Sequence, residues 1–488
     1  MSVARVAPAP ALWRIRILAG AALTASLVVV VGVATVAAAG PSVWFVAGVC
    51  AFALALLVLA ALRGFEGFGI ALVVASMLPL PTVTLLGTAQ FPFASFAVVA
   101  LLVSAWWVAR VRGLTPSAPC VMPYLVLIGV AAVSLAASWL FWDARVPTGA
   151  ERGYGHRSIV YQLTGLYLLA FPLVAFAAGA FSSRLIRVDR LLAWVCVALT
   201  GLTVYALSGW IQHPGNPIDL FNTGDRVKFD YQWAAFLAVA SSALLLNARS
   251  RRLRIIAVAL LALAAFTVSV EYVLSAWLGV AIGIAFVVWL RFGWRGVVLM
   301  AAAITAAALV VEPTVSAIVS QRASSTDVDR LKIWQSALIV WSKSPLIGVG
   351  PANLASYMET YSLFPLGLVL QGYQQAHNIF LEILAEEGVA GIALLVAFVW
   401  LILRSLVRWH PESTPDAVAR AGAGGVLITA AVIASLGGGF IPTIASAGYN
   451  ALPYVLVYWF VGGFAAARAA HAVARQRVFA PARVAVSG

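Results

Sequence analysis

The chain has 488 residues, of which 63% are hydrophobic and 10% charged, and its mean hydropathy is +0.99. A soluble protein would carry about a quarter charged residues, so the composition excludes an ordinary globular domain. The net charge of +14 does not indicate nucleic-acid binding, because the basic residues form no single run and lie between apolar segments. Cys50, Cys120 and Cys196 lack metal-ligand spacing and predict no disulfide framework.

Many apolar runs reach the roughly 20 residues that a helix needs to cross a bilayer. Because backbone polar groups in lipid have to be satisfied internally, the runs predict helices rather than open strands. The predicted fold is therefore an all-α polytopic membrane protein with about 12 to 14 transmembrane helices. In chain order the expected spans are residues 17–39, 43–62, 68–86, 91–108, 121–142, 159–181, 191–211, 233–246, 255–268, 272–290, 297–311, 389–403, 422–440 and 451–467.

The first apolar run ends in Ala37-Ala38-Ala39, which resembles a signal-peptidase site, but the run is too long for a signal peptide and predicts an uncleaved span. With the N-terminus inside and alternating spans, most of the 31 Lys and Arg residues fall on the cytoplasmic side. Both termini are therefore predicted to be cytoplasmic. The outer loops keep Arg145, Arg152, Arg157, Arg226, Lys228, Arg322, Arg330, Lys332 and Lys343.

The predicted organisation is transmembrane helices with short loops over residues 1–311, a large periplasmic loop over 312–377, and C-terminal transmembrane helices with a cytoplasmic tail over 378–488. A loop this long in a compact membrane protein is usually functional. Leu331, Trp334, Leu338 and Trp341 recur at helical spacing, which predicts an amphipathic helix at the membrane interface. Residues 344–351, rich in Gly and Pro, should end that helix in turns.

A polar stretch, residues 373–388, precedes the apolar run 389–403, and His377 lies where the outer loop enters the membrane. A neutral imidazole can accept a proton near neutral pH; the alternative is that His377 only anchors the helix. Glu382 either orients the imidazole or caps the helix N-terminus, and we favour capping. His156, beside Arg152 and Arg157, is a rival base.

Three segments carry a family resemblance: Asp329–Trp334, Lys343–Asn353 and His377–Gly388. Together they resemble the O-antigen ligase and polymerase superfamily over about residues 220–400. The resemblance implies a GT-C-like, multi-pass glycosyltransferase of the bacterial inner membrane. Its large, partly helical periplasmic loop precedes the last three helices, and its donor is a glycan linked to undecaprenyl diphosphate.

The resemblance implies that His377 is the catalytic base and that Arg226 and Arg330 hold the donor diphosphate. Asn378, Glu382, Arg152 and Arg157 are further candidates for supporting roles. Arginine suits a diphosphate because its planar fork binds phosphate bidentately and stays charged. Alternatively, Arg226 only anchors at the interface, and Arg330 only pairs with Asp327 or Asp329. One departure from the family is that residues 271–277 contain no arginine.

The implied reaction is inverting transfer of the glycan to a sugar hydroxyl of a lipid A-core acceptor on the periplasmic face. A polymerase that takes a second lipid-linked repeat as acceptor is the alternative. Neither cofactor nor metal is expected, because Asp327 and Asp329 alone would provide too few oxygen ligands for a divalent cation. A lipid or polysaccharide transporter is the alternative of another class, but transporters place ionisable groups near the bilayer midplane, and the predicted spans have almost none there.

Overall fold

The computed structural model describes residues 64–77, 82–85, 89–114, 118–146, 159–212, 231–271, 273–323, 326–364, 376–436, 440–441 and 448–484. The expected spans over residues 17–39 and 43–62 lie outside these ranges, and so do Arg152, Arg157 and Arg226. The side chains of residues 306–329, including Asp327 and Asp329, are also outside the description.

The described part of the chain is built almost wholly from helices, which confirms the predicted all-α polytopic class. Eight helices are long and apolar enough to cross a membrane, and Gly64–Met77, Ala97–Val111 and Tyr231–Asn247 are shorter apolar helices. The labelled helices are α3 (Phe93–Val111), α4 (Met122–Leu140), α5 (Ile159–Ser182), α6 (Val188–Gln212), α8 (Tyr231–Asn247), α9 (Arg251–Glu271), α10 (Leu274–Ala323), α11 (Thr326–Trp341), α12 (Leu354–Tyr361), α14 (Ile379–Arg408), α15 (Thr414–Ser435) and α16 (Gly448–Val484).

One expected span is wrong. The run over residues 68–86 is not a continuous helix: the structure describes a helix over Gly64–Met77, and residues 82–85 belong to an antiparallel hairpin formed by β1 (Thr82–Leu85) and β2 (Ala89–Pro92). The run contains Pro79 and Pro81, and proline disfavours a continuous helix because it removes a backbone donor and clashes with the preceding helical turn. The next span accordingly begins after the hairpin, as α3.

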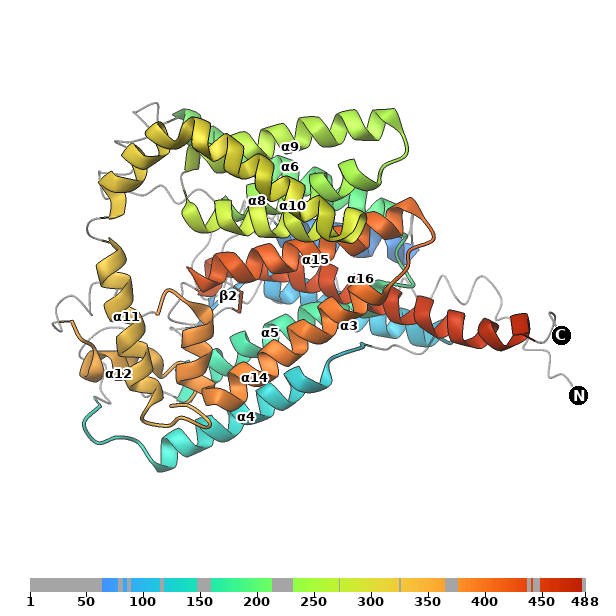
Figure 1. Ribbon diagram of the computed structural model, residues 1–488. Coiled ribbons are helices and arrows are strands. Elements are labelled where there is room, and N and C mark those ends of the chain that lie inside the picture. The colour runs from blue at the N-terminus through green and yellow to red at the C-terminus, as the bar shows by residue number, and fades with distance from the viewer. Residues whose placement is uncertain are drawn as a thin grey trace, which may run out of the picture.

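The helices form a layered bundle (Figure 1). α6, α8, α9 and α10 lie together on one side, and α3, α4, α5 and α14 lie on the other, with α15 and α16 between them. The closest approach joins α5 to α16: a Cβ built on Gly179 would meet the carbonyl oxygen of Phe460 at 2.0 Å, and one on Gly463 would meet that of Phe176 at 2.0 Å. Small residues that let backbones touch are typical of packed membrane helices.

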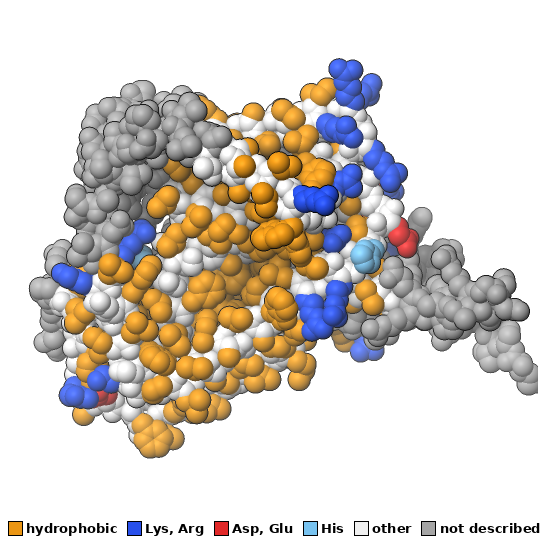
Figure 2. Space-filling view, viewed as in Figure 1, with side chains coloured by type: hydrophobic (Ala, Val, Ile, Leu, Met, Phe, Trp, Pro, Cys, Tyr) orange, Lys and Arg blue, Asp and Glu red, His pale blue; other side chains and the backbone are white. Residues whose placement is uncertain are grey.

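The surface has a broad apolar band between two polar edges (Figure 2). Large apolar side chains on several helices are more than half exposed, among them Val133, Ile255 and Trp400. Lysine and arginine gather at the edge from which α16 projects, opposite the end that carries α11 and α12. A band of this kind is the surface expected of a multi-pass membrane protein.

Two of the long helices are interrupted at glycines. Gly293 in α10 has φ 66° and ψ −159°, so the helix divides there, in agreement with two separate expected spans over 272–290 and 297–311. Gly388 in α14 has φ 69° and ψ −168°. Residues 379–387 therefore form a short helix of their own, and the long helix begins at Val389, where the sequence predicts a span to begin.

Candidate functional site

A small separate core lies at the end of the molecule opposite the C-terminus, which is the predicted periplasmic end (Figure 1). It joins the segment after α4 to α11, α12 and the first turns of α14. Ala376, directly before His377, and Ile333, three residues after Arg330, are both buried in it. The core thus brings all three family-like segments, which are distant in sequence, into one packed unit. Its buried members are Val146, Ile333, Ala337, Val340, Val349, Leu354, Tyr357, Met358, Ala376 and Ala385.

The loop between α11 and α12 fills the break in α14. Val349 N–H donates to the carbonyl of Ala385 at 2.9 Å, and Gly350 N–H donates to that of Glu386 at 2.9 Å. In the other direction, the carbonyls of residues 345 and 346 accept from the N–H groups of residues 389 and 390, at 2.9 and 3.1 Å. A helix break leaves carbonyls and N–H groups without intrahelical partners. One loop satisfies both sets, and this explains why the turn residues of 344–351 lie where they do.

A buried polar network holds the same loop against α4 and α5. Gln162 in α5 is fully buried; its amide donates to the side-chain oxygen of Asn353 and accepts from the indole N–H of Trp139. Asn353 in turn donates to the carbonyl of Val349 at 2.8 Å. Ser134 of α4 lies within hydrogen-bond distance of two carbonyls at the break, those of residues 348 and 386. Sequence reasoning missed Gln162, although an amide within an apolar run was a usable signal.

His377 adopts a left-handed backbone conformation, with φ 48°, immediately before α14. Such a conformation costs a non-glycine residue about 1–2 kcal/mol, so the surrounding structure has to hold it there. The next residue, Asn378, is the helix N-cap: its side-chain oxygen accepts from the N–H groups of Phe380 and Leu381 at 3.0 and 3.3 Å. Asn378 therefore fixes the point at which the chain turns from the loop into the helix, and with it the position of His377.

Three carboxylates are buried in the short helix that follows: Glu382, Glu386 and Glu387. Glu382 lies in the first turn, where a negative charge is favoured, but the side chain that caps this helix is Asn378. Glu386 accepts from the N–H of Leu354 at 3.1 Å, so it binds the first turn of α12. The sequence-based preference for Glu382 as a cap therefore did not identify the capping residue.

The predicted helix in the long loop exists as α11. Ile333, Ala337 and Val340 are buried in the small core and Trp334 packs against it, whereas Leu331 is 56% exposed and Leu338 40% exposed. The two leucines therefore lie on a face that does not pack on the protein. Arg330 lies half-buried at the start of this helix.

A charged cluster links the end of α4 to α12. Asp143 accepts from the guanidinium of Arg145 at 2.9 Å and from the hydroxyl of Tyr361. The Arg145 hydrogen bond, followed by that of Tyr361, holds the pKa of Asp143 well below its usual range. Lys343 lies 4.3 Å from the centroid of the Tyr361 ring, in cation–π geometry. The cluster positions α12 beside the loop that fills the break.

Arg330 lies on α11, and His377, Asn378 and Glu382 lie at the start of α14; both segments pack in the small core, while Arg226 lies outside the described residues. Residues 271–277 contain no arginine, which is the departure from the family pattern noted above. In this stretch Trp277 packs between α8 and α9 and donates its indole N–H to the carbonyl of Val268 at 2.8 Å. That corner is filled by an aromatic side chain instead of a cation.

Residues 270–396 match the family of the O-antigen ligase. Residues 270–396 are called the O-antigen ligase domain below, after this similarity. The match covers α10, α11, α12, the loop between the last two and both sides of the break in α14, which supports the O-antigen ligase and polymerase superfamily. No curated protein matches the chain. The O-antigen ligase domain contains Arg330 and His377 but not Arg226.

Proposed function

We propose that this protein transfers a glycan from undecaprenyl diphosphate to a sugar hydroxyl of a lipid A-core acceptor on the periplasmic face of the bacterial inner membrane. The observation that carries the proposal is the O-antigen ligase domain, because its matched residues are those of the packed loop and broken helix around His377. The substrates are a lipid-linked donor and a lipid-anchored acceptor, both reached from the membrane.

His377 acts as the general base. Its imidazole takes the proton of the acceptor hydroxyl, the oxygen attacks the anomeric carbon, and the bond from that carbon to the diphosphate oxygen breaks. Attack from the side opposite the leaving group inverts the anomeric configuration. The position of His377 between the buried Ala376 and the N-cap residue Asn378 supports this role, because a base has to be held in a fixed place to accept a proton efficiently.

Arg330 and Arg226 hold the leaving diphosphate. Negative charge grows on its oxygens as the glycosidic bond breaks, and fixed guanidinium groups stabilise that charge in a water-poor site. Arg330 lies in the second turn of α11, whose buried face packs in the same core as the residue before His377. Glu382 supports the histidine, Asn378 positions it, and Arg152 and Arg157 have supporting roles. No metal or cofactor takes part in the proposed step.

The test is reconstitution of the purified protein in liposomes with an undecaprenyl-diphosphate-linked glycan and one of two acceptors. Product that forms with lipid A-core, and not with a second lipid-linked repeat, supports the ligase. The reverse result makes the protein a polymerase, which uses the same donor chemistry. Movement of the donor across the bilayer without any glycosidic bond formed would assign the protein to the transporters instead.

A further inference from the structure

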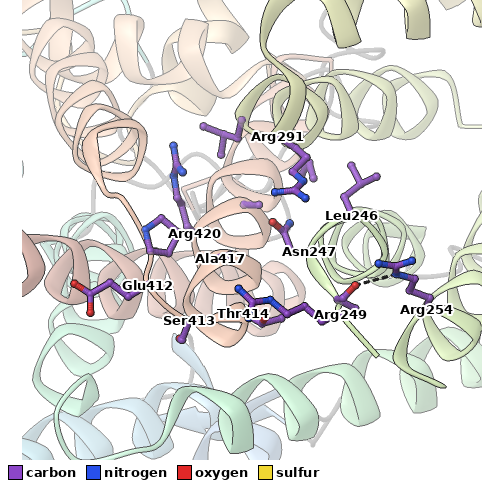
Figure 3. A pocket seen from close by; sticks show the side chains of 15 residues that line it. Leu246, Asn247, Arg249, Arg254, Arg291, Glu412, Ser413, Thr414, Ala417 and Arg420 are labelled. Carbon is purple, nitrogen blue, oxygen red and sulfur yellow. Dashed lines mark hydrogen bonds between the residues drawn. The ribbon is translucent and has the colours of Figure 1, made fainter. Parts of the chain in front are cut away.

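A second site lies at the opposite end of the molecule, far from the O-antigen ligase domain's loop. A cavity of about 300 Å³ opens between the end of α8, the start of α9, the middle of α10 and the start of α15. By the positive-inside rule this is the cytoplasmic side. Figure 3 shows arginines from four different segments around the same opening. They are Arg249, Arg254, Arg291 and Arg420.

Two of these guanidinium groups are fixed by the backbone. Arg254 donates its Nε to the carbonyl of Ala248 at 2.9 Å, drawn as the dashed line in Figure 3. Arg420 donates to the carbonyls of Leu406 and Val407 at 2.8 and 3.0 Å. Neutral carbonyls orient an arginine without cancelling its charge. The cavity therefore has positive groups that are held in place before any ligand arrives.

No arginine of the cavity forms an ion pair with a residue that the structure describes. The carboxylates of this side are few, and three are already used: Glu66 pairs with Arg190, Asp189 with Arg187, and Asp416 with Arg468. Only Glu412 remains at the rim. Residues 1–63 contain no Asp or Glu that could supply another.

Four like charges around one opening repel each other, and an anion that entered would relieve the repulsion. The neighbouring surface indicates what carries this anion. Leu253, next to Arg254, is 41% exposed, and Phe292, next to Arg291, is 57% exposed. The exposed apolar side chains beside the arginines could contact acyl chains. A phospholipid has acyl chains and a soluble anion has none, so the surface favours a phospholipid. Basic pockets between transmembrane helices on this side are suited to anionic lipid headgroups.

We propose that the cavity lined by Arg249, Arg254, Arg291 and Arg420 binds the phosphate headgroup of an anionic phospholipid of the cytoplasmic leaflet. The guanidinium groups donate to the phosphate oxygens, and the acyl chains lie along the exposed faces of α9 and α10. The site is separate from the proposed transferase site and does not depend on that proposal.

Native mass spectrometry of the purified protein tests this. The protein is stripped of lipid in detergent, and phosphatidylglycerol or phosphatidylcholine is added. We expect one retained phosphatidylglycerol and no retained phosphatidylcholine. The double variant Arg249→Gln/Arg291→Gln should lose phosphatidylglycerol affinity by on the order of a hundredfold, because it removes two charge-assisted contacts that each contribute about a factor of ten. Both side chains are exposed, so the variant should fold.

The matched control is Arg251→Gln/Arg252→Gln, which removes the same charge from exposed positions of α9 that do not line the cavity. It should retain phosphatidylglycerol as the wild type does. Equal loss in both double variants, or no loss in either, overturns the site. Addition of inorganic phosphate tests whether the cavity binds a lipid headgroup or a soluble phosphate ion. If it displaces the lipid and raises the melting temperature of the lipid-free wild type but not of Arg249→Gln/Arg291→Gln, the cavity takes a soluble anion and the lipid assignment is wrong.

Discussion

Gly348 and Gly388 lie at the break in α14, and each packs against the residue two positions before the other. A Cβ on Gly388 would meet the carbonyl oxygen of Leu346 at 2.3 Å, and one on Gly348 would meet the carbonyl oxygen of Glu386 at 2.2 Å. Both glycines also have positive φ, 69° and 74°. Only glycine allows this conformation and this approach together. The two residues, 40 positions apart, are what lets the loop close the gap in the helix.

Gly348→Ala and Gly388→Ala should each destabilise the protein by about 2 kcal/mol or more. Alanine is disfavoured at the left-handed backbone conformation of these positions, and its Cβ would also clash with the facing backbone carbonyl. Thermal unfolding in detergent measures the loss. Gly129→Ala in α4 is the control, since nothing lies within 4 Å of a Cβ there and alanine favours a helix. A melting temperature for Gly388→Ala as high as that of Gly129→Ala would contradict the contact.

Removal of the imidazole should abolish transfer without unfolding the protein. His377→Gly is the sharpest variant, because glycine adopts the left-handed backbone of this position without penalty. We expect its stability to stay within about 1 kcal/mol of the wild type and donor binding to persist, while product formation is lost. His410→Ala, on the predicted cytoplasmic side, is the control and should stay active.

The activity of the wild-type protein should fall as the pH is lowered, because a protonated imidazole cannot act as a base. Full activity of His377→Gly would assign the base to another residue.

Arg330→Lys and Arg226→Lys should each lower kcat/KM by about tenfold or more, because lysine keeps the charge but not the bidentate fork. Initial rates in proteoliposomes at several donor concentrations measure the effect. Arg295→Lys, an exposed conservative change in α10 on the predicted cytoplasmic side, should have wild-type rates. If Arg330→Lys is as active as Arg295→Lys, the residue has no part in holding the diphosphate.

The contribution of Asp143 to stability should depend on pH. Its pKa is lowered in the folded protein, so its stabilising effect is present above the pKa of the unfolded state, about 4, and is lost as pH falls through the folded pKa. Asp143→Asn should therefore melt below the wild type at neutral pH, and the difference should shrink in strong acid. A difference that is the same at all pH values would mean that the charge of Asp143 is not what links α4 to α12.

Chelation should leave the proposed transfer unchanged. The step needs only a base and fixed cations on the diphosphate, and both are supplied by side chains. Assays with and without excess EDTA, followed by addition of Mg²⁺ or Mn²⁺, measure this directly. Activity that disappears with chelator and returns with a divalent ion would move the diphosphate-binding role from the arginines to a metal.

Composition and hydropathy alone determined the class of this protein. Long apolar runs in a chain with 10% charged residues leave helices as the structure that satisfies the backbone in lipid, and this signal is local. The same reasoning correctly placed the helix of residues 331–341, the turns of 344–351 and the start of a span at Val389. It failed at residues 68–86, an apolar run that contains two prolines and whose residues 82–85 form a β-strand.

Tertiary structure decided what no local pattern could. The buried face of α11 is set by its partners in the small core, so Ile333, Ala337 and Val340 are buried while Leu331 and Leu338 are exposed. The break at Gly388 is stable because a loop some forty residues earlier supplies its hydrogen bonds, and Arg249, Arg254, Arg291 and Arg420 line one cavity because four segments meet there. Hydropathy along a sequence records how each residue partitions into lipid, but which neighbour satisfies a backbone group or shares a cavity depends on contacts between distant segments.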